Sequence, residues 1–277
     1  MSLHRRGLLA GLTGLLGGGC SPTAWLNANT PREGYTLQPN IPYGAHRRQK
    51  LDYYTPTAPR PDGKTVVFFH GGGWYQGHKH EFLFLAQALA SNGIAVVIPN
   101  YRLYPEVRFP VFLEDCALAV GWAAGQIGID KLFVMGHSAG AYNAAMMAAN
   151  TPYLANVGVD RMRLRGFIGI AGAYNFLPLT RPEAIDLFGG PNNPDTQPIT
   201  FATSPLPPAL LLHGSDDASI DPRQSVDFAA AWQATGAQAQ LTVYPQTDHA
   251  RILGAFLTRG RGTPPSRDDT VAWIDTH

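Results

Sequence analysis

Six short apolar runs, rich in β-branched residues, recur along the chain between positions 65 and 244. They are Thr65–Phe69, Ile94–Ile98, Lys131–Met135, Phe167–Ile170, Ala209–Leu212 and Gln240–Tyr244. Runs of four to eight residues without polar alternation are typical of strands buried on both faces of a parallel sheet. The pattern therefore predicts a mostly parallel sheet at the centre of the protein.

Segments with the apolar spacing of a helix lie between these runs. Residues 82–89 carry Phe82, Leu85, Ala86 and Leu89 on one face at intervals of three and four. Four further segments have a helical pattern: Val111–Ala124, Ala141–Asn150, Arg223–Thr235 and Ser266–Thr276. Strands that alternate with helices predict an α/β fold in which helices cover both faces of the sheet.

Residues 30–62 are rich in proline, glycine and tyrosine and contain two short extended candidates, Ile41–Tyr43 and Leu51–Tyr54. These read as edge strands or a hairpin. The chain shows neither an internal repeat nor a linker that would divide it. We therefore predict a single globular domain over residues 41–277, preceded by an extended tail over residues 20–40.

The N-terminus has the pattern of an export signal. A basic segment ends at Arg6 with two adjacent arginines, an apolar stretch follows at Gly7–Leu16, and Cys20 comes after three glycines. The stretch is too short to span a bilayer. We predict residues 1–19 to be a signal of twin-arginine type and the protein to reach the cell envelope or periplasm. A lipid anchor on Cys20, release as a soluble protein and a wrongly assigned start stay open, because the lipoprotein motif is imperfect.

Composition narrows the class of protein. The chain of 277 residues is 45% hydrophobic and 15% charged, which is ample for a core, and 21 Lys and Arg face 20 Asp and Glu without a run of like charges. This balance gives no basic surface for a phosphate backbone and excludes nucleic acid as a partner. Without Cys20, only Cys116 is left, so we expect no internal disulfide.

The strongest chemical motif is Gly-His-Ser-Ala-Gly at residues 136–140, between a predicted strand and an alanine-rich helix. A nucleophilic serine at the tip of such a turn needs small residues two positions away on either side, because the backbone folds back on itself. Ser138 is therefore the candidate nucleophile. The alternative for this motif alone is a structural turn.

A second motif, His-Gly-Gly-Gly-Trp at residues 70–74, directly follows the first predicted strand. Successive glycines leave backbone amides free to face a ligand oxygen, as an acyl-transfer enzyme requires for its oxyanion. We assign the amides of Gly71, Gly72 and Ala139 to an oxyanion hole. A flexible glycine turn is the alternative.

With these two motifs, the sequence resembles the α/β-hydrolase carboxylesterases, near the hormone-sensitive-lipase-like and the feruloyl and acetylxylan esterase-like branches. The segment Pro99–Glu106 and Asp115 match a further part of that pattern. The resemblance implies that four residues brace the oxyanion loop rather than catalyse: Tyr101, Arg102, Glu106 and Asp115. The sequence departs from many lipase-like relatives at His137, where they carry an acid, and it lacks a long N-terminal cap.

The fold that this resemblance implies places a triad acid and then a histidine after the serine. Asp216 and Asp217 follow a predicted strand, and the resemblance favours Asp217, three residues after the glycine of His213-Gly214. Asp216 stays open as the alternative. Of nine histidines, only His249 combines this chain order with a loop after the last predicted strand.

Together these residues predict a serine esterase that needs neither metal nor organic cofactor. Trp74, Tyr75 and Phe176 are candidates for the substrate pocket, and the short segment between Ala173 and Pro208 favours small, short-acyl esters over long-chain lipids. The apolar residues of this segment are equally compatible with ordinary core packing. Two alternatives stay open. One is an arylformamidase-like amidase, and the other is a non-catalytic binding protein on the same scaffold.

Overall fold

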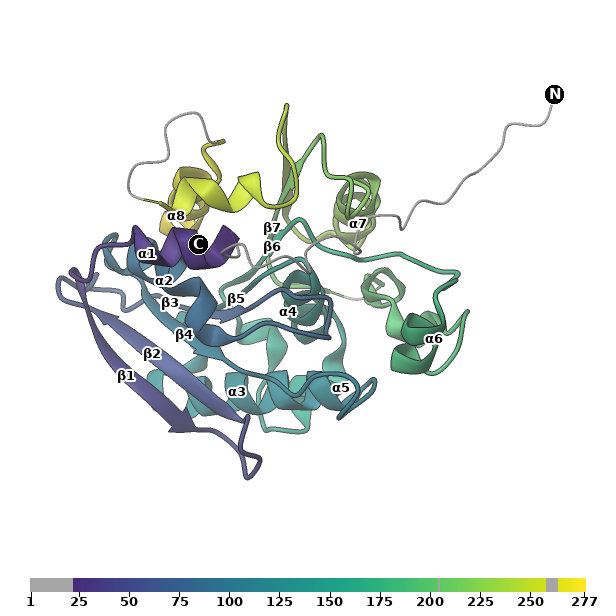
Figure 1. The fold of residues 1–277 in the computed structure, drawn as a ribbon, viewed down its shortest axis with the longest axis horizontal. Coiled ribbons are helices and arrows are strands. Elements are labelled where there is room, and N and C mark those ends of the chain that lie inside the picture. Colours follow the sequence, from purple (N-terminus) through teal and green to yellow (C-terminus); the bar gives the residue numbers. More distant parts are fainter. Residues whose placement is uncertain (1–21, 204, 258–263) are drawn as a thin grey trace.

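The computed structural model describes residues 22–203, 205–257 and 264–277 (Figure 1). The predicted export segment and Cys20 lie outside the described residues. Within the described part, no helix combines the length and the apolar character needed to cross a bilayer.

A single sheet of eight strands forms the centre of the molecule (Figure 1). Its strands are β1 (Tyr35–Pro42), β2 (Lys50–Pro56), β3 (Thr65–Phe69), β4 (Ala95–Pro99), β5 (Leu132–His137), β6 (Gly166–Ile170), β7 (Ala209–Gly214) and β8 (Ala239–Tyr244). Their spatial order is β1-β2-β4-β3-β5-β6-β7-β8, and the strands from β4 to β8 in this order run parallel. The six predicted strands are all present, and the prediction of a mostly parallel sheet is confirmed.

β1 and β2 form an antiparallel pair at one edge of the sheet, and β2 joins β4 antiparallel. The two predicted extended pieces are thus parts of longer strands. The segment predicted as an extended tail contains α1 (Pro22–Ala28) and most of β1. It takes part in the fold because β1 pairs along β2 and Leu26 is buried in the core.

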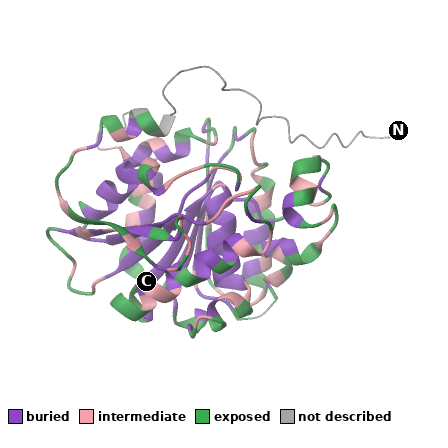
Figure 2. Cartoon of the chain, turned by 60° about the horizontal axis from the view of Figure 1, so that its bottom comes forward, coloured by how far each residue is buried: buried purple, intermediate pink, exposed green. Residues whose placement is uncertain are grey.

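Helices cover both faces of the sheet, as predicted, and the buried residues form the layer between them (Figure 2). The helices are α1, α2 (Leu83–Ala90), α3 (Val111–Ile127), α4 (Ala139–Ala149), α5 (Thr151–Ala155), α6 (Pro182–Phe188), α7 (Arg223–Ala234) and α8 (Ser266–Thr276). Short 3-10 turns lie at Lys79–Phe82, Ile129–Lys131, Arg161–Arg163, Pro194–Thr196, Pro198–Phe201 and Arg251–Phe256.

Successive side chains of a strand point to opposite faces of the sheet, so the core consists of two clusters, one on each face. In β3, Val67 and Phe69 pack toward α3, α4 and α7, whereas Val66 and Phe68 pack toward α2 and α8. Since β3, β5, β7 and β8 are parallel, the loops that follow them all leave the same edge of the sheet. That edge is where ligands bind in open α/β sheets.

Candidate active site

Ser138 occupies a sharp turn between β5 and α4. Its backbone has φ 57° and ψ −123°. Residues other than glycine rarely adopt this conformation, and those that do are often found at functional sites. A Cβ on Gly136 would lie 2.0 Å from the Gly140 oxygen, and one on Gly140 would lie 1.9 Å from the Phe69 oxygen. The two flanking glycines are therefore required by backbone packing, which is the reason given for them from the sequence.

The glycine loop after β3 lies directly against this turn. A Cβ on Gly71 would lie 3.3 Å from the Cβ of Ser138. Gly72 has φ +121°, and a Cβ there would lie 2.1 Å from the Gln76 oxygen. Among the described residues, the amides of Gly71, Gly72 and Ala139 have no acceptor, and Ala139 is the first residue of α4. These three amides are thus free to face a ligand oxygen.

The buried Tyr101 and the half-buried Arg48 support the glycine loop. The Tyr101 hydroxyl donates to the His70 oxygen at 2.7 Å, and the two rings stack at 4.4 Å. Arg48 donates to the oxygens of Gly77 and Tyr101, each at 2.6 Å. No motif surrounds Arg48, so the sequence alone did not indicate this role.

Asp115 and Arg102 form a second support. Arg102 makes a bidentate ion pair with the fully buried Asp115, at 2.7 Å for the shortest contact, and Gln49 donates to the same carboxylate at 2.6 Å. Glu106 does not belong to this support. It pairs at 3.0 Å with the partly exposed His46, because the loop after Tyr104 turns it toward solvent.

Asp217 and His249 meet although they follow different strands, β7 and β8. Nδ1 of His249 lies 2.7 Å from Oδ2 of Asp217. Oδ1 of Asp217 accepts from the amides of Ser219 and Ile220 at 2.8 and 2.9 Å. Asp216 lies apart from this contact, because its exposed carboxylate accepts from Ser215 instead. Of the two adjacent aspartates, Asp217 is the one that contacts the imidazole.

The charge state of Asp217 follows from its partners. Burial acts to raise the pKa of the carboxyl, but hydrogen bonds from His213 and His249 and the Ile220 amide outweigh it and hold the pKa well below its usual range. Asp217 is therefore ionised near neutral pH and accepts a hydrogen bond from each imidazole.

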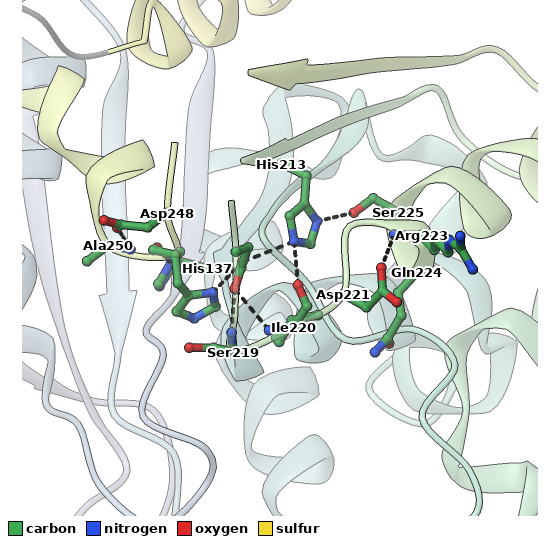
Figure 3. A network of polar contacts seen from close by, with 12 residues as sticks. His137, His213, Ser219, Ile220, Asp221, Arg223, Gln224, Ser225, Asp248 and Ala250 are labelled. Carbon is green, nitrogen blue, oxygen red and sulfur yellow. Dashed lines mark hydrogen bonds and ion pairs between the residues drawn. The ribbon is translucent and has the colours of Figure 1, made fainter. Parts of the chain in front are cut away.

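Two more histidines, His137 and His213, lie beside this pair, and the sequence alone assigned them no role. The His137 Nε2 lies 3.0 Å from the main-chain oxygen of His249, and the two rings are 4.7 Å apart. Burial lowers the pKa of His137 to about 3, so its ring is neutral and Nε2–H donates. His213 lies between Ser225 and Ile220 (Figure 3). Its place four residues before Asp217, at the end of a strand, was the available clue.

Trp74, in the glycine loop, is the centre of an aromatic cluster beside the Ser138 turn. Its Nε1 donates to Asn143 of α4 at 3.1 Å. Its ring lies 5.0 to 6.2 Å from those of Phe188, Tyr142, Phe112 and Phe176. The predicted pocket residues Trp74 and Phe176 therefore contact each other, whereas Tyr75 is partly exposed and pairs with Tyr104. The cluster leaves Trp74 with only 9% of its surface exposed.

A cavity of about 500 Å³ is lined by residues that include Arg48, His78, Lys79 and His80. Its buried charge is already compensated. The Lys79 ammonium bonds to Asp52, Asn40 and His80 at 2.5 to 3.0 Å. In the described part of the chain, no three His, Cys, Asp or Glu side chains gather in a way that could hold a metal ion.

The chain is similar in sequence to known hydrolases. A family model described as BD-FAE matches residues 51–232. Kynurenine formamidase of Salmo salar is 30% identical over 230 residues, which cover 77% of this chain and 75% of that protein. The isoprenylcysteine alpha-carbonyl methylesterase of Arabidopsis thaliana is 28% identical over 262 residues, or 85% of this chain. The chain spans 61% of the length of that methylesterase.

Solved structures share the architecture. Esterase B from Lactobacillus rhamnosis superposes with a TM-score of 0.76 at 21% identity, covering 92% of this chain and 90% of that one. A truncated carbohydrate esterase from gut microbiota gives 0.75 at 17% identity, covering 90% and 98%. A hormone-sensitive lipase from a metagenome library gives 0.73 at 22% identity, covering 92% and 90%. At these identities the likeness concerns the fold, and the predicted α/β-hydrolase fold is confirmed.

Proposed function

Because the chain belongs to the BD-FAE family of α/β-hydrolase esterases, we propose that it is a serine carboxylesterase acting on small, short-acyl esters. Ser138 is the nucleophile, His249 the general base and Asp217 the residue that orients the imidazole. The amides of Gly71, Gly72 and Ala139 form the oxyanion hole. Neither a metal nor an organic cofactor takes part in this proposal.

One observation carries the proposal above the others. The imidazole of His249 and the ionised carboxylate of Asp217 lie 2.7 Å apart although 32 residues separate them in the chain. Nδ1–H donates to the carboxylate, so Nε2 of a neutral His249 is left as the acceptor that a base requires. His137, the neighbour of Ser138, bonds to the main chain of His249, which ties the serine turn to the histidine loop.

The proposed reaction proceeds in two halves. Nε2 of His249 takes the hydroxyl proton of Ser138 while Oγ of Ser138 attacks the ester carbonyl. The carbonyl oxygen gains negative charge, which the three amides stabilise by hydrogen bonds. His249 then gives the proton to the leaving alcohol, and an acyl-serine remains. Water, activated by the same imidazole, attacks this ester and releases the carboxylic acid and the free enzyme.

The preference for short acyl chains rests on the aromatic cluster around Trp74. Rings from α3, α4 and α6 pack against the indole within 6.2 Å and fill the space beside the glycine loop. A long acyl chain would have to displace buried rings there, which costs free energy that an acetyl or butyryl group does not require. We place Trp74, Phe176 and Tyr75 at the substrate, with Tyr75 at the exposed rim.

The amidase alternative has support of its own, because a kynurenine formamidase is 30% identical over most of both chains. The proposed triad could cleave a formamide by the same two steps. The methylesterase relative suggests a methyl ester as a further candidate, with a small leaving alcohol. These three substrate classes are distinguished by measurement on one preparation.

The test combines active-site labelling with a substrate panel. Wild-type protein and Ser138→Ala are treated with a fluorophosphonate probe and assayed on para-nitrophenyl esters of increasing acyl length, on simple methyl esters and on N-formylkynurenine. We expect labelling that Ser138→Ala abolishes, a loss of turnover on the order of 10⁶ in that variant, and faster hydrolysis of acetate or butyrate than of long-chain esters.

Each result assigns a class. Preferred cleavage of N-formylkynurenine would replace the esterase by the formamidase, and faster hydrolysis of long-chain esters would refute the short-acyl pocket. Absence of labelling and of hydrolysis in the wild type would overturn the enzymatic proposal in favour of a binding protein.

We also propose that the enzyme acts in the cell envelope or periplasm, on the strength of the N-terminal pattern up to Cys20. Cell fractionation of the full chain and of Cys20→Ala tests this. Membrane association that the substitution abolishes would support a lipid anchor, and cytoplasmic retention of both would refute export.

A further inference from the structure

We propose that His213 and Ser225 form a buried extension of the candidate triad, in which His213 is a positioning residue that holds the Asp217 carboxylate in line with His249. The inference rests on the proposed function for its catalytic meaning. Its structural content, the link from Ser225 through His213 to Asp217, is defined by distances and burial alone.

The protonation of His213 at Nε2 follows from its neighbours. This nitrogen lies 3.1 Å from the main-chain oxygen of Ile220 (Figure 3). It also lies 3.0 Å from Oδ2 of Asp217. An ionised carboxylate and a carbonyl are both acceptors, so the nitrogen between them must carry the hydrogen. His213 therefore donates toward Asp217 and cannot present a lone pair to it.

Ser225 fixes this arrangement from the other side of the ring. Its Oγ lies 2.7 Å from Nδ1 of His213, and both side chains are fully buried. In the neutral ring Nδ1 is an acceptor, so the Ser225 hydroxyl donates to it. Ser225 belongs to α7, so packing of this helix on the sheet selects the tautomer that faces Asp217.

The Asp217 carboxylate is thereby held at all of its acceptor positions. Oδ2 accepts from His249 and His213, and Oδ1 accepts from the amides of Ser219 and Ile220. Four donors on two oxygens leave the carboxylate no rotation that keeps every bond, because an ionised carboxylate offers about four lone-pair sites. His249 thus meets an acceptor whose orientation is fixed before substrate arrives.

Loss of the His213 donor has two consequences for His249. The Asp217 carboxylate can rotate, so the His249 imidazole is in the productive orientation in a smaller fraction of the molecules. The Asp217 carboxylate also accepts one hydrogen bond fewer. Its negative charge is then less compensated and stabilises the protonated form of His249 more strongly. The pH at which His249 gains its proton must therefore rise, and this sign is the same whether the His213 ring is neutral or charged.

Other titratable groups near the network do not reverse this expectation. His137 on β5 faces both Asp217 and His249, and its neutral ring is bonded to the His249 main chain. Asp216, Asp221 and Asp248 bond instead to Ser215 and to the amides of Arg223, Ala250 and Arg251. None of these three carboxylates bonds to either imidazole of the Asp217 network among the described contacts.

The experiment measures the titration of His249 directly by NMR, with its imidazole resonance assigned from its loss in His249→Gln. His213→Leu removes the donor at similar volume. We expect the midpoint of His249 to rise by about half to one pH unit, as the loss of one hydrogen bond implies. The acid limb of kcat/KM should move by the same amount, with kcat reduced up to about tenfold and KM unchanged.

Three further variants make the result specific. Ser225→Ala should raise the midpoint in the same direction but less, since it frees the tautomer without removing the ring. His213→Gln, whose amide can still donate to Asp217, should restore most of the wild-type midpoint. Phe228→Leu, a matched change in the core under α7, should lower the melting temperature and leave the midpoint of His249 in place.

An unshifted midpoint in both His213→Leu and Ser225→Ala would overturn the inference, as would an equal shift in Phe228→Leu. The NMR titration does not depend on turnover. A wild type without esterase activity would therefore refute the proposed function and leave the Ser225-His213-Asp217 link to be judged by the titration alone.

Discussion

At the residue scale, adjacent side chains of the same type have different environments. Asp216 and Asp217 are neighbours in a loop, but the side chain of Asp217 is fully buried against two imidazoles and that of Asp216 bonds to the hydroxyl of Ser215 at the surface. The order serine, acid, histidine along the chain points to this pair of aspartates as candidates for the acid. Within the pair, the family resemblance favours Asp217, and the structure shows that the loop turns this carboxylate, and not that of Asp216, toward His249.

Substitution of each aspartate by asparagine separates the two. We expect Asp217→Asn to reduce kcat by about 10⁴-fold, because an amide at this site lets His249 adopt the wrong tautomer. Asp216→Asn should change kcat less than twofold and serves as the matched control. Steady-state assays on a short-acyl ester would measure both, and comparable losses would contradict the assignment of Asp217.

Histidines show the limit of residue-level reasoning. His249 could be selected because it alone has the required order in the chain. The contact of His137 could not be derived, because its partner His249 lies 112 residues away in the chain. His213 lies only four residues before Asp217, but no motif indicates that its ring turns toward this carboxylate. Arg48 is a similar case, because it supports the glycine loop through oxygens 29 and 53 residues away.

At the element scale, the backbone of the glycine loop constrains its own shape, in addition to the side chains of Tyr101 and Arg48 that support it. Gly72 combines a positive φ with a Cβ position that meets the oxygen of Gln76. An alanine there must distort the loop that carries the proposed oxyanion amides.

We expect Gly72→Ala to reduce kcat by roughly 10² to 10³, the effect of losing one oxyanion donor. Gly125→Ala is the matched control, because that glycine lies in α3 with nothing within 4 Å of an added Cβ. It should keep full activity and raise the free energy of unfolding by about 0.5–1 kcal/mol. Activity assays and urea unfolding would check both, and an active Gly72→Ala would remove this loop from the mechanism.

The predicted strands and the long helices agree with the structure because their apolar periodicity is also their burial pattern. Shorter elements were missed. α1, α5 and α6 have five to seven residues, too few to show a helical period. α6 matters for specificity, since Phe188 at its end packs on Trp74.

At the scale of the whole molecule, buried neutral histidines link stability to pH. Burial lowers the pKa of both His70 and His137 to about 3, against about 6.5 for an exposed histidine. Between these values the unfolded chain binds protons that the folded chain does not. Stability is therefore fully present above pH 6.5 and is lost as the pH falls toward 3. The low pKa of Asp217 adds to this loss only below about pH 5.

We expect each of these two histidines to lower the free energy of unfolding by about 2 kcal/mol between pH 7 and pH 5. Urea unfolding at both pH values would measure the loss, and His137→Gln should reduce the pH dependence by about that amount. An identical dependence in the variant would show that His137 takes up its proton in the folded state.

The sequence by itself determined the α/β architecture, the serine turn, the glycine loop and the chain order of the candidate triad. These features are local, because apolar periodicity, glycine spacing and the order of elements are written in neighbouring residues. Only the tertiary structure decided that Asp217 rather than Asp216 meets His249, that His213 and Ser225 hold this carboxylate, and that aromatic rings from three helices close around Trp74. Those contacts join separate strands and helices, and their geometry follows from how the layers pack, which no local pattern records.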